Sequence, residues 1–345
     1  MRTLCKFGCC LVAAVAAFGA SAEVLWDWDG SKLTEILPEE STETAWQLNL
    51  SAAGALSLAK EGTNPVLDLR AETMPAGVYE IKTFPRLIGN DNGAANCTTV
   101  YLPASVTTLA ANAFRCWKKL TSVHLDQTAI TEIPGYCFFR CSALSEVVLP
   151  DSVTSIAGNA FQECSALTSV NLTDGLTAIG GNAFYSCSSL ASIALPETLT
   201  TIGSSAFQNC TSLERFEPGL PSGLVSIDHQ ALRNCPKLTT DFVVGYALNG
   251  DEVLATAVGN YLLCDSRAVK TVRLGPGVST LQANMWSNTD PAFVDLGCNI
   301  PSTPSFPNGY TSLTNLIVRY TGDFLEVPQF SPTLPNPCEA PRGFD

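Results

Sequence analysis

Apolar and polar positions recur along the middle of the chain with an interval of about 23 residues. In one copy, Val147 and Leu149 alternate with polar residues, as in a half-buried strand. Pro150 predicts a turn after that strand, because proline fixes its own φ and has no N–H to donate. Val153 and Ile156 supply the next inward-facing positions. Aligned on their last leucine, the copies span residues 97–120, 121–144, 145–167, 168–190, 191–213 and 214–238.

The second half of each copy predicts a short helical or 3₁₀ segment. In the copy above, Gly158 opens a turn, Ala160 and Phe161 begin the segment, and Cys164 ends it. A phenylalanine returns at the same place in five copies, so we expect the rings to stack along the axis of the repeat. These residues are Phe114, Phe138, Phe161, Phe184 and Phe207.

A single copy cannot bury its own apolar side chains. Each buried Leu, Ile or Phe contributes roughly 1.5–3 kcal/mol, but only when a neighbouring coil covers it. A fixed period of this length with an L-x-x-V/I-x-L pattern is typical of leucine-rich-repeat solenoids, whose ends need caps. We predict a repeat solenoid of one β-strand plus a short helix or 3₁₀ segment per coil, with a β-rich N-terminal cap and irregular C-terminal coils.

The repeated frame L-P-x-x-V/L-T-x-I-G-x-x-A-F-x-x-C-x-x-L resembles the BspA-like, or Treponema pallidum-type, leucine-rich repeats of bacterial surface proteins. The resemblance implies a secreted or surface-displayed, non-enzymatic protein that takes part in adhesion to host proteins or to other bacteria. Periodicity by itself indicates only the scaffold.

The N-terminal flank divides into two predicted parts. Residues 1–22 have the features of a secretory signal peptide, with Arg2 and Lys6 before an apolar run and a small-residue cleavage site. The run is shorter than the about 18–20 apolar residues of a membrane-spanning helix. Residues 23–96 contain no clean repeat and predict a β-rich cap, with a separate domain as the alternative. Strand-like alternation occurs at residues 46–50, 66–69 and 78–81.

The C-terminal flank keeps a weaker form of the repeat. Strand frames return at residues 269–274 and 313–318, so residues 239–327 predict degenerate coils and a C-terminal cap. Residues 328–345 contain five prolines and no periodicity, which favours an extended tail.

The chain is acidic, with 19 Lys and Arg against 32 Asp and Glu and a formal net charge of −13. Cleavage after residue 22 would remove Arg2 and Lys6 and leave about −15. Such a chain repels nucleic acid and anionic lipid, so we expect neither as a partner. Asp27 to Gly30 resembles a calcium-loop fragment, but the Gly and Glu spacing of such loops is missing, which favours a turn.

Fourteen cysteines in an exported chain raise the question of disulfides. Adjacent coils about 4.8 Å apart would hold parallel Cβ atoms near that distance, whereas a disulfide prefers about 3.5–4.5 Å. We therefore favour buried free thiols that donate weakly to backbone carbonyls. Disulfides, and a metal site at Cys137 and Cys141, are the alternatives. The cysteines at the repeat spacing are Cys141, Cys164, Cys187, Cys210 and Cys235.

No sequence motif for catalysis or for cofactor binding occurs, and we expect no cofactor, metal or catalytic residue. His124 and His229 are about one hundred residues apart, which separates them by several coils. Asp126 and Glu146 could approach the about 5–9.5 Å spacing of a glycosidase pair, although surface carboxylates do so by chance in an acidic chain.

The outer side of the strand ladder is the predicted recognition surface, because its residues vary while the inward positions repeat. One exposed row is Tyr101, His124, Val148, Asn171, Ala194 and Glu217, and the neighbouring row is Thr99, Ser122, Glu146, Ser169, Ser192 and Arg215. Tyr101 and His124 are the strongest candidates, because aromatic side chains with a polar tip are enriched at interface hot spots. The candidate ligand-binding residues are Tyr101, Ser122, His124, Glu146, Asn171, Arg215 and Glu217.

Three functional classes are compatible with these patterns. The leading hypothesis is a secreted or cell-surface protein that binds extracellular proteins or glycans, without membrane span after signal cleavage. The alternatives are a structural, self-assembling surface scaffold and a carbohydrate-active enzyme, which the missing catalytic cluster disfavours. The sequence leaves the oligomeric state open.

Overall fold

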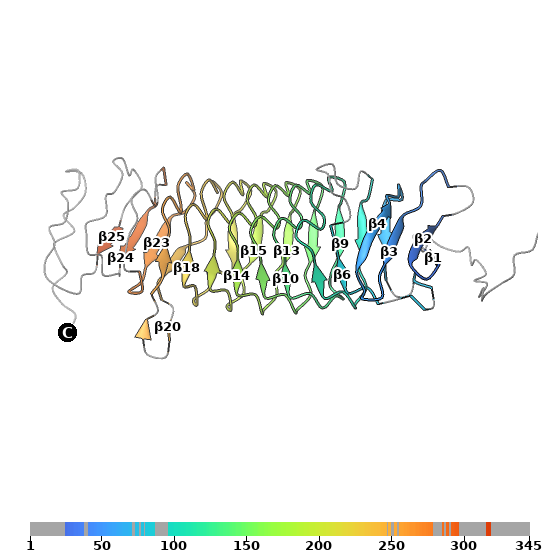
Figure 1. Ribbon diagram of the computed structural model, residues 1–345. Helices are drawn as coiled ribbons and strands as arrows, with labels where there is room; N and C mark the ends of the chain where they lie inside the picture. The colour runs from blue at the N-terminus through green and yellow to red at the C-terminus, as the bar shows by residue number, and fades with distance from the viewer. Residues whose placement is uncertain are drawn as a thin grey trace, which may run out of the picture.

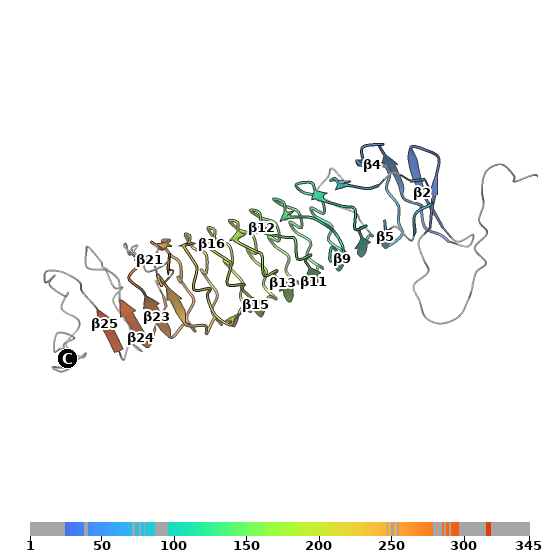
Figure 2. The same cartoon turned by 90° about the horizontal axis from the view of Figure 1, so that it is seen from below.

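The computed structural model describes residues 25–37, 41–70, 73–75, 77–78, 80–86, 96–246, 248–249, 252–253, 255–278, 285, 288–289, 291–296 and 315–318. Within these ranges the chain forms an elongated solenoid with its coils stacked along one axis (Figures 1 and 2). The repeat-solenoid prediction is confirmed. The predicted signal peptide and Pro-rich tail lie outside the described residues.

The N-terminal end is a four-stranded antiparallel sheet in sequence order. A tight turn at Asp29 joins its first two strands: Oδ1 accepts the N–H of Ser31 at 2.9 Å and that of Lys32 at 2.7 Å. These backbone hydrogen bonds lower the pKa of Asp29. The strands are β1 (Leu25–Trp28), β2 (Lys32–Ile36), β3 (Gln47–Leu50) and β4 (Leu56–Lys60).

Indole side chains join this sheet to the first coils. The Trp26 Nε1–H donates to the Asp68 carbonyl at 2.6 Å, and the Trp46 ring stacks on Trp117 at 6.4 Å between centroids. The sequence predicted a strand at residues 78–81. This prediction is wrong for residues 78, 80 and 81, the three that the structure describes, because none of them belongs to a strand. Ile81 is buried as its pattern indicated, but pairing begins only at Lys82, whose N–H donates to Gly54. The strand there is β6 (Thr83–Phe84).

The first face of the solenoid is a ladder of parallel three-residue strands, one per coil. Equivalent residues of consecutive coils pair directly, for example Tyr101 with His124 and His124 with Val148. One sheet holds β5 (Val66–Asp68), β7 (Thr99–Tyr101), β9 (Ser122–His124), β11 (Glu146–Val148) and β13 (Ser169–Asn171), and β15 (Ser192–Ala194) pairs with β17 (Arg215–Glu217).

The second face is a ladder of two-residue parallel strands, and the second residue of each strand is apolar and buried in the core. β8 (Thr108–Leu109) pairs with β6. The longer run consists of β10 (Glu132–Ile133), β12 (Ser155–Ile156), β14 (Ala178–Ile179), β16 (Thr201–Ile202), β18 (Ser226–Ile227) and β22 (Ala257–Val258).

The third part of each coil is a chain of turns, so the predicted helical or 3₁₀ segment is wrong. Asn159 and Glu163 have φ values of 63° and 61°, and a left-handed residue every fourth position interrupts a right-handed helix. The N–H groups instead reach the next coil: those of Asn159, Phe161 and Glu163 donate to the carbonyls of Gly181, Ala183 and Tyr185 at 2.8–2.9 Å. We call this row of hydrogen bonds the turn ladder.

Stacked phenylalanines fill the core beneath the turn ladder, as the repeat predicted. The rings of Phe114, Phe138, Phe161, Phe184 and Phe207 are fully buried, and consecutive centroids lie 5.1–5.3 Å apart. Phe84 adds a further ring, 4.8 Å from that of Phe114. Close backbone approach allows this spacing: a Cβ on Gly180 would lie 2.6 Å from the Gly158 nitrogen.

The five cysteines at the repeat spacing form a column of buried free thiols, and we call them the column cysteines: Cys141, Cys164, Cys187, Cys210 and Cys235. Each thiol donates to the backbone carbonyl of a phenylalanine in an earlier coil. The Sγ–O distances are 3.0 Å for Cys141 to Phe114 and 3.1 Å for Cys187 to Phe161. Burial raises the pKa of these thiols, to about 12 for Cys235. Among the described residues, Cys137 and Cys141 belong to no group of three or more side chains that could hold a metal ion, as a zinc site requires.

The C-terminal coils carry longer strands and one hairpin. The four-stranded parallel sheet is β19 (Phe242–Val244), β23 (Thr271–Leu274), β24 (Phe293–Leu296) and β25 (Asn315–Val318). The hairpin of β20 (Leu248–Asn249) and β21 (Glu252–Val253) projects from the side of the solenoid (Figure 1).

Candidate recognition surfaces

The strand ladder brings all seven sequence-predicted candidates onto one face. In the first row Tyr101 pairs with His124, and Val148 with Asn171, while Ala194 pairs with Glu217 further along. Their side chains are half-buried or exposed, as are those of the second row. The second row runs Thr99, Ser122, Glu146 and Ser169, then Ser192 and Arg215.

Tyr101 and His124 form a stacked aromatic pair on this face. Their rings are nearly parallel, with an interplanar angle of 10° and centroids 4.1 Å apart. On the other side, the Cζ atom of Arg70 lies 4.3 Å from the Tyr101 centroid, a cation–π distance. We call these three residues the Arg70–Tyr101–His124 stack.

Asp68 holds the outer end of that stack. It lies in β5 directly beside Tyr101, is only 3% exposed, and accepts both Arg70 Nε at 3.0 Å and Nη2 at 2.5 Å. A bidentate hydrogen bond of this kind fixes the plane of the guanidinium group. Sequence analysis missed Arg70 and Asp68. Aligning Val66–Asp68 with Thr99–Tyr101 as one more coil would have found them.

The opposite end of the strand face is polar. Arg215 Nε and Glu217 Oε1 form an ion pair of 2.7 Å within one strand, and both side chains are about half exposed. Surface pairs of this kind contribute little to stability. Asp126 and Glu146, the pair named for a glycosidase, are both exposed, and Asp126 accepts the Gln127 amide at 2.8 Å. This open setting differs from the concave pockets that enclose small substrates.

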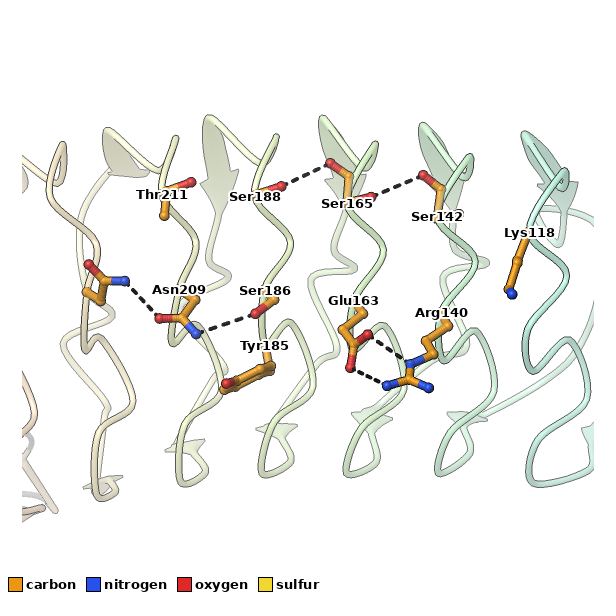
Figure 3. A pocket seen from close by; sticks show the side chains of 11 residues that line it. Lys118, Arg140, Ser142, Glu163, Ser165, Tyr185, Ser186, Ser188, Asn209 and Thr211 are labelled. Carbon is orange, nitrogen blue, oxygen red and sulfur yellow. Dashed lines mark hydrogen bonds and ion pairs between the residues drawn. The ribbon is translucent and has the colours of Figure 1, made fainter. Parts of the chain in front are cut away.

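A second surface lies beside the turn ladder, where sequence analysis named no candidate. It is a groove with a volume of about 730 Å³ (Figure 3). Its main row consists of the residues that directly precede the column cysteines, all of which have a positive φ. The amino acid at this position varies from copy to copy, whereas the cysteine repeats. The lining residues are Lys118, Arg140, Ser142, Glu163, Ser165, Tyr185, Ser186, Ser188, Asn209, Thr211 and Asn234.

The side chains of this groove bond to one another from coil to coil. Arg140 Nε lies 2.8 Å from Glu163 Oε2, and both side chains are partly exposed. Asn234 Nδ2 donates to Asn209 Oδ1 at 2.9 Å, and Asn209 Nδ2 donates to Ser186 Oγ at 3.5 Å. Figure 3 shows the Arg140–Glu163 pair and the Asn209–Ser186 contact in one row. A second row contains Ser142, Ser165 and Ser188, in which the Ser165 and Ser188 hydroxyls donate to the backbone of the preceding coil.

The described part of the chain contains no group of three or more His, Cys, Asp or Glu side chains placed to hold a metal ion. None of its residues belongs to a helix with the length and hydropathy needed to cross a membrane.

Comparison with solved structures finds bacterial leucine-rich repeat proteins. A leucine-rich repeat protein from Bacteroides ovatus is 20% identical, with a TM-score of 0.58 over 87% of this chain and 76% of that one. The T. pallidum leucine-rich repeat protein is 20% identical over 65% of this chain and 87% of its own, with a TM-score of 0.43. At this level of identity the likeness shows the fold alone. No curated protein matches the chain.

A family model settles what kind of repeat this is. The BspA type leucine rich repeat region matches in six copies, over residues 92–191, 131–249 and 177–311. These overlapping segments run from residue 92 to residue 311 and so include more than half of the 345 residues. The chain therefore belongs to the BspA-type leucine-rich repeat family.

Proposed function

We propose that this protein is a secreted or cell-surface recognition protein that binds extracellular proteins or glycans of a host or of other bacteria through its strand face. It performs no chemistry of its own and uses no cofactor. Membership of the BspA-type family and the signal-like residues 1–22 support export and an adhesion-type role.

The observation that carries the proposal is the Arg70–Tyr101–His124 stack. Tyrosine and arginine are enriched among residues that dominate binding energy, and here their geometry is fixed before a partner arrives. Asp68 and the neighbouring coil immobilise them at little further entropic cost. Thr99 and Ser122 beside the stack are small and polar, whereas Val148, which pairs with His124, is exposed and apolar. A partner would therefore meet one aromatic centre with an apolar neighbour.

The test is a binding screen with purified residues 23–345 against immobilised extracellular-matrix proteins, mucins, glycans and bacterial surfaces, at two salt concentrations. We expect saturable binding that Tyr101→Ala and His124→Ala each weaken tenfold or more, because hot-spot truncations cost more than about 1.4 kcal/mol. Tyr246→Ala is the matched control, since it removes an exposed tyrosine elsewhere on the solenoid.

Two outcomes would contradict the proposal. The first is saturable binding that neither strand-face variant changes. The second is absence of binding to every surface together with concentration-dependent self-association in sedimentation, which would favour the structural scaffold instead.

A further inference from the structure

We propose that the groove beside the turn ladder is a second binding site, and that its ligand is an extended, uncharged, hydroxyl-rich oligosaccharide. This site lies on a different part of the coil from the strand face. It goes beyond the function proposed above and does not depend on it.

The shape of the groove suits a linear ligand. It extends over six consecutive coils, from Lys118 to Asn234, and the coils follow one another at about the 5.1–5.3 Å spacing of the phenylalanine rings. Its volume of about 730 Å³ lies within the range of ligand-binding clefts, roughly 300–1,000 Å³. A regular row of polar groups matches a polymer that presents hydroxyls at regular intervals, and a glycan chain is such a polymer.

The chemistry of the lining suits hydroxyl groups. The row offers both kinds of group: the Arg140 guanidinium donates, the Glu163 carboxylate accepts, and the Ser186 hydroxyl and the Asn209 amide can do both. A sugar hydroxyl both donates and accepts, so it can bond to either kind of group. Arg140 and Glu163 neutralise each other, which disfavours a highly charged ligand.

The backbone of this row is held in an unusual conformation. Arg140 and Glu163 have φ values of 58° and 61°, and Ser186, Asn209 and Asn234 lie between 56° and 64°. Gly and Asn adopt this region at least cost, whereas Arg and Glu do so rarely. The same conformation recurs outside the groove, for example at Asn112, Asn159 and Asn182, so it belongs to the turn ladder. What it does for the groove is to align these side chains in one row.

Tyr185 supplies an apolar surface for the ligand. It is half-buried within the groove, so its ring can pack against the C–H face of a sugar while polar neighbours bind hydroxyls. Protein–protein interfaces gather several large aromatic side chains and methionines at their core, whereas Tyr185 is the only such residue in this lining. Among the described residues, the exposed large apolar side chains lie outside the groove lining: Ile36, Tyr136, Val148, Tyr246 and Tyr261.

The experiment is isothermal titration of residues 23–345 with cello-, xylo-, manno- and chito-hexaose, the matching disaccharides, and an oligogalacturonate of the same length. We expect at least one neutral hexaose to bind, and its disaccharide to bind at least tenfold more weakly. Tyr185→Ala should weaken hexaose binding tenfold or more, Tyr185→Phe should restore it, and Glu163→Gln should weaken it. Tyr101→Ala on the strand face should leave it unchanged.

Each remaining outcome overturns the site. No binding of any neutral hexaose at millimolar concentration would do so, as would binding that Tyr101→Ala abolishes and Tyr185→Ala does not. Binding of the oligogalacturonate alone, lost in high salt and in Lys118→Ala, would indicate simple charge attraction. A thermal melt of every variant separates loss of binding from loss of fold, and none of these results bears on the strand-face test.

Discussion

Phe184→Ala is expected to destabilise the central coils by about 3–5 kcal/mol. The ring is fully buried between those of Phe161 and Phe207, 5.2 Å and 5.3 Å away, so its removal leaves a cavity bounded by two rigid rings. Because repeat proteins lose stability through nearest-neighbour interfaces, the damage should concentrate in the adjoining coils. Thermal unfolding followed by amide hydrogen exchange measures both the size and the place of the loss.

Phe184→Leu is the matched control. Leucine already occupies the equivalent slot at Leu232, where it is fully buried, so the coil geometry accepts it. We expect this variant to lose much less stability than Phe184→Ala. Loss of protection confined to the N-terminal sheet, or equal losses in the two variants, would contradict the stacked core.

Alkaline pH is expected to unfold the protein steeply, because the column thiols stay protonated in the folded chain. Burial raises the pKa of Cys235 from 9.0 to about 12, and raises those of Cys164, Cys187 and Cys210 well above 9.0. As pH rises above 9, the unfolded chain therefore releases thiol protons that the folded chain retains. Between pH 9 and about 12, Cys235 lowers the free energy of unfolding by about 1.4 kcal/mol per pH unit, and the other three thiols act in the same direction.

Denaturant melts at pH 8, 9, 10 and 11 measure this slope, and Cys235→Ala isolates one thiol. The variant should show a shallower fall in unfolding free energy, whatever its stability at pH 8. Native-state alkylation supplies the second readout, since only the thiolate reacts and Cys235 is buried. Rapid modification of Cys235 in folded protein at pH 8, or an unchanged slope, would contradict the free-thiol column.

The repeated part of the fold could be predicted from the sequence because each copy has the same pattern of apolar and polar positions. Alternation at Val147 and Leu149 places β11, and the same positions in the other copies place β7, β9, β13, β15 and β17. The fixed spacing of Phe161 and Cys164 predicts both columns. Strict periodicity leaves only one way to bury these side chains: each must lie against its copy in the next coil.

The turn segment was predicted wrongly because its amino acids are compatible with a helix. The segment forms turns instead of a helix because Asn159 and Glu163 have a left-handed backbone conformation and because its N–H groups donate to the following coil. The asparagines at positions 112, 159 and 182 were the available signal, since Asn adopts that conformation more readily than most residues.

The candidate surfaces were only partly visible for a related reason. Tyr101 and His124 stood out as aromatic residues in an exposed row, but Arg70 belongs to a coil that does not keep the repeat frame. The groove depends on which side chains from different coils share a row, and that follows from the turn geometry. The repeat places Arg140 and Glu163 at equivalent positions before Cys141 and Cys164, but only the turn geometry shows that these side chains line a groove.

Both proposed surfaces depend on one claim: the coils are held in fixed register by two strand ladders and the turn ladder. Native-state hydrogen exchange of the amides of Asn159, Phe161 and Glu163 tests it most directly, because these N–H groups bond only across coils. We predict that they exchange as slowly as the amides of strands β11 and β13. Exchange at the rate of an open loop, with the strands still protected, would contradict the account.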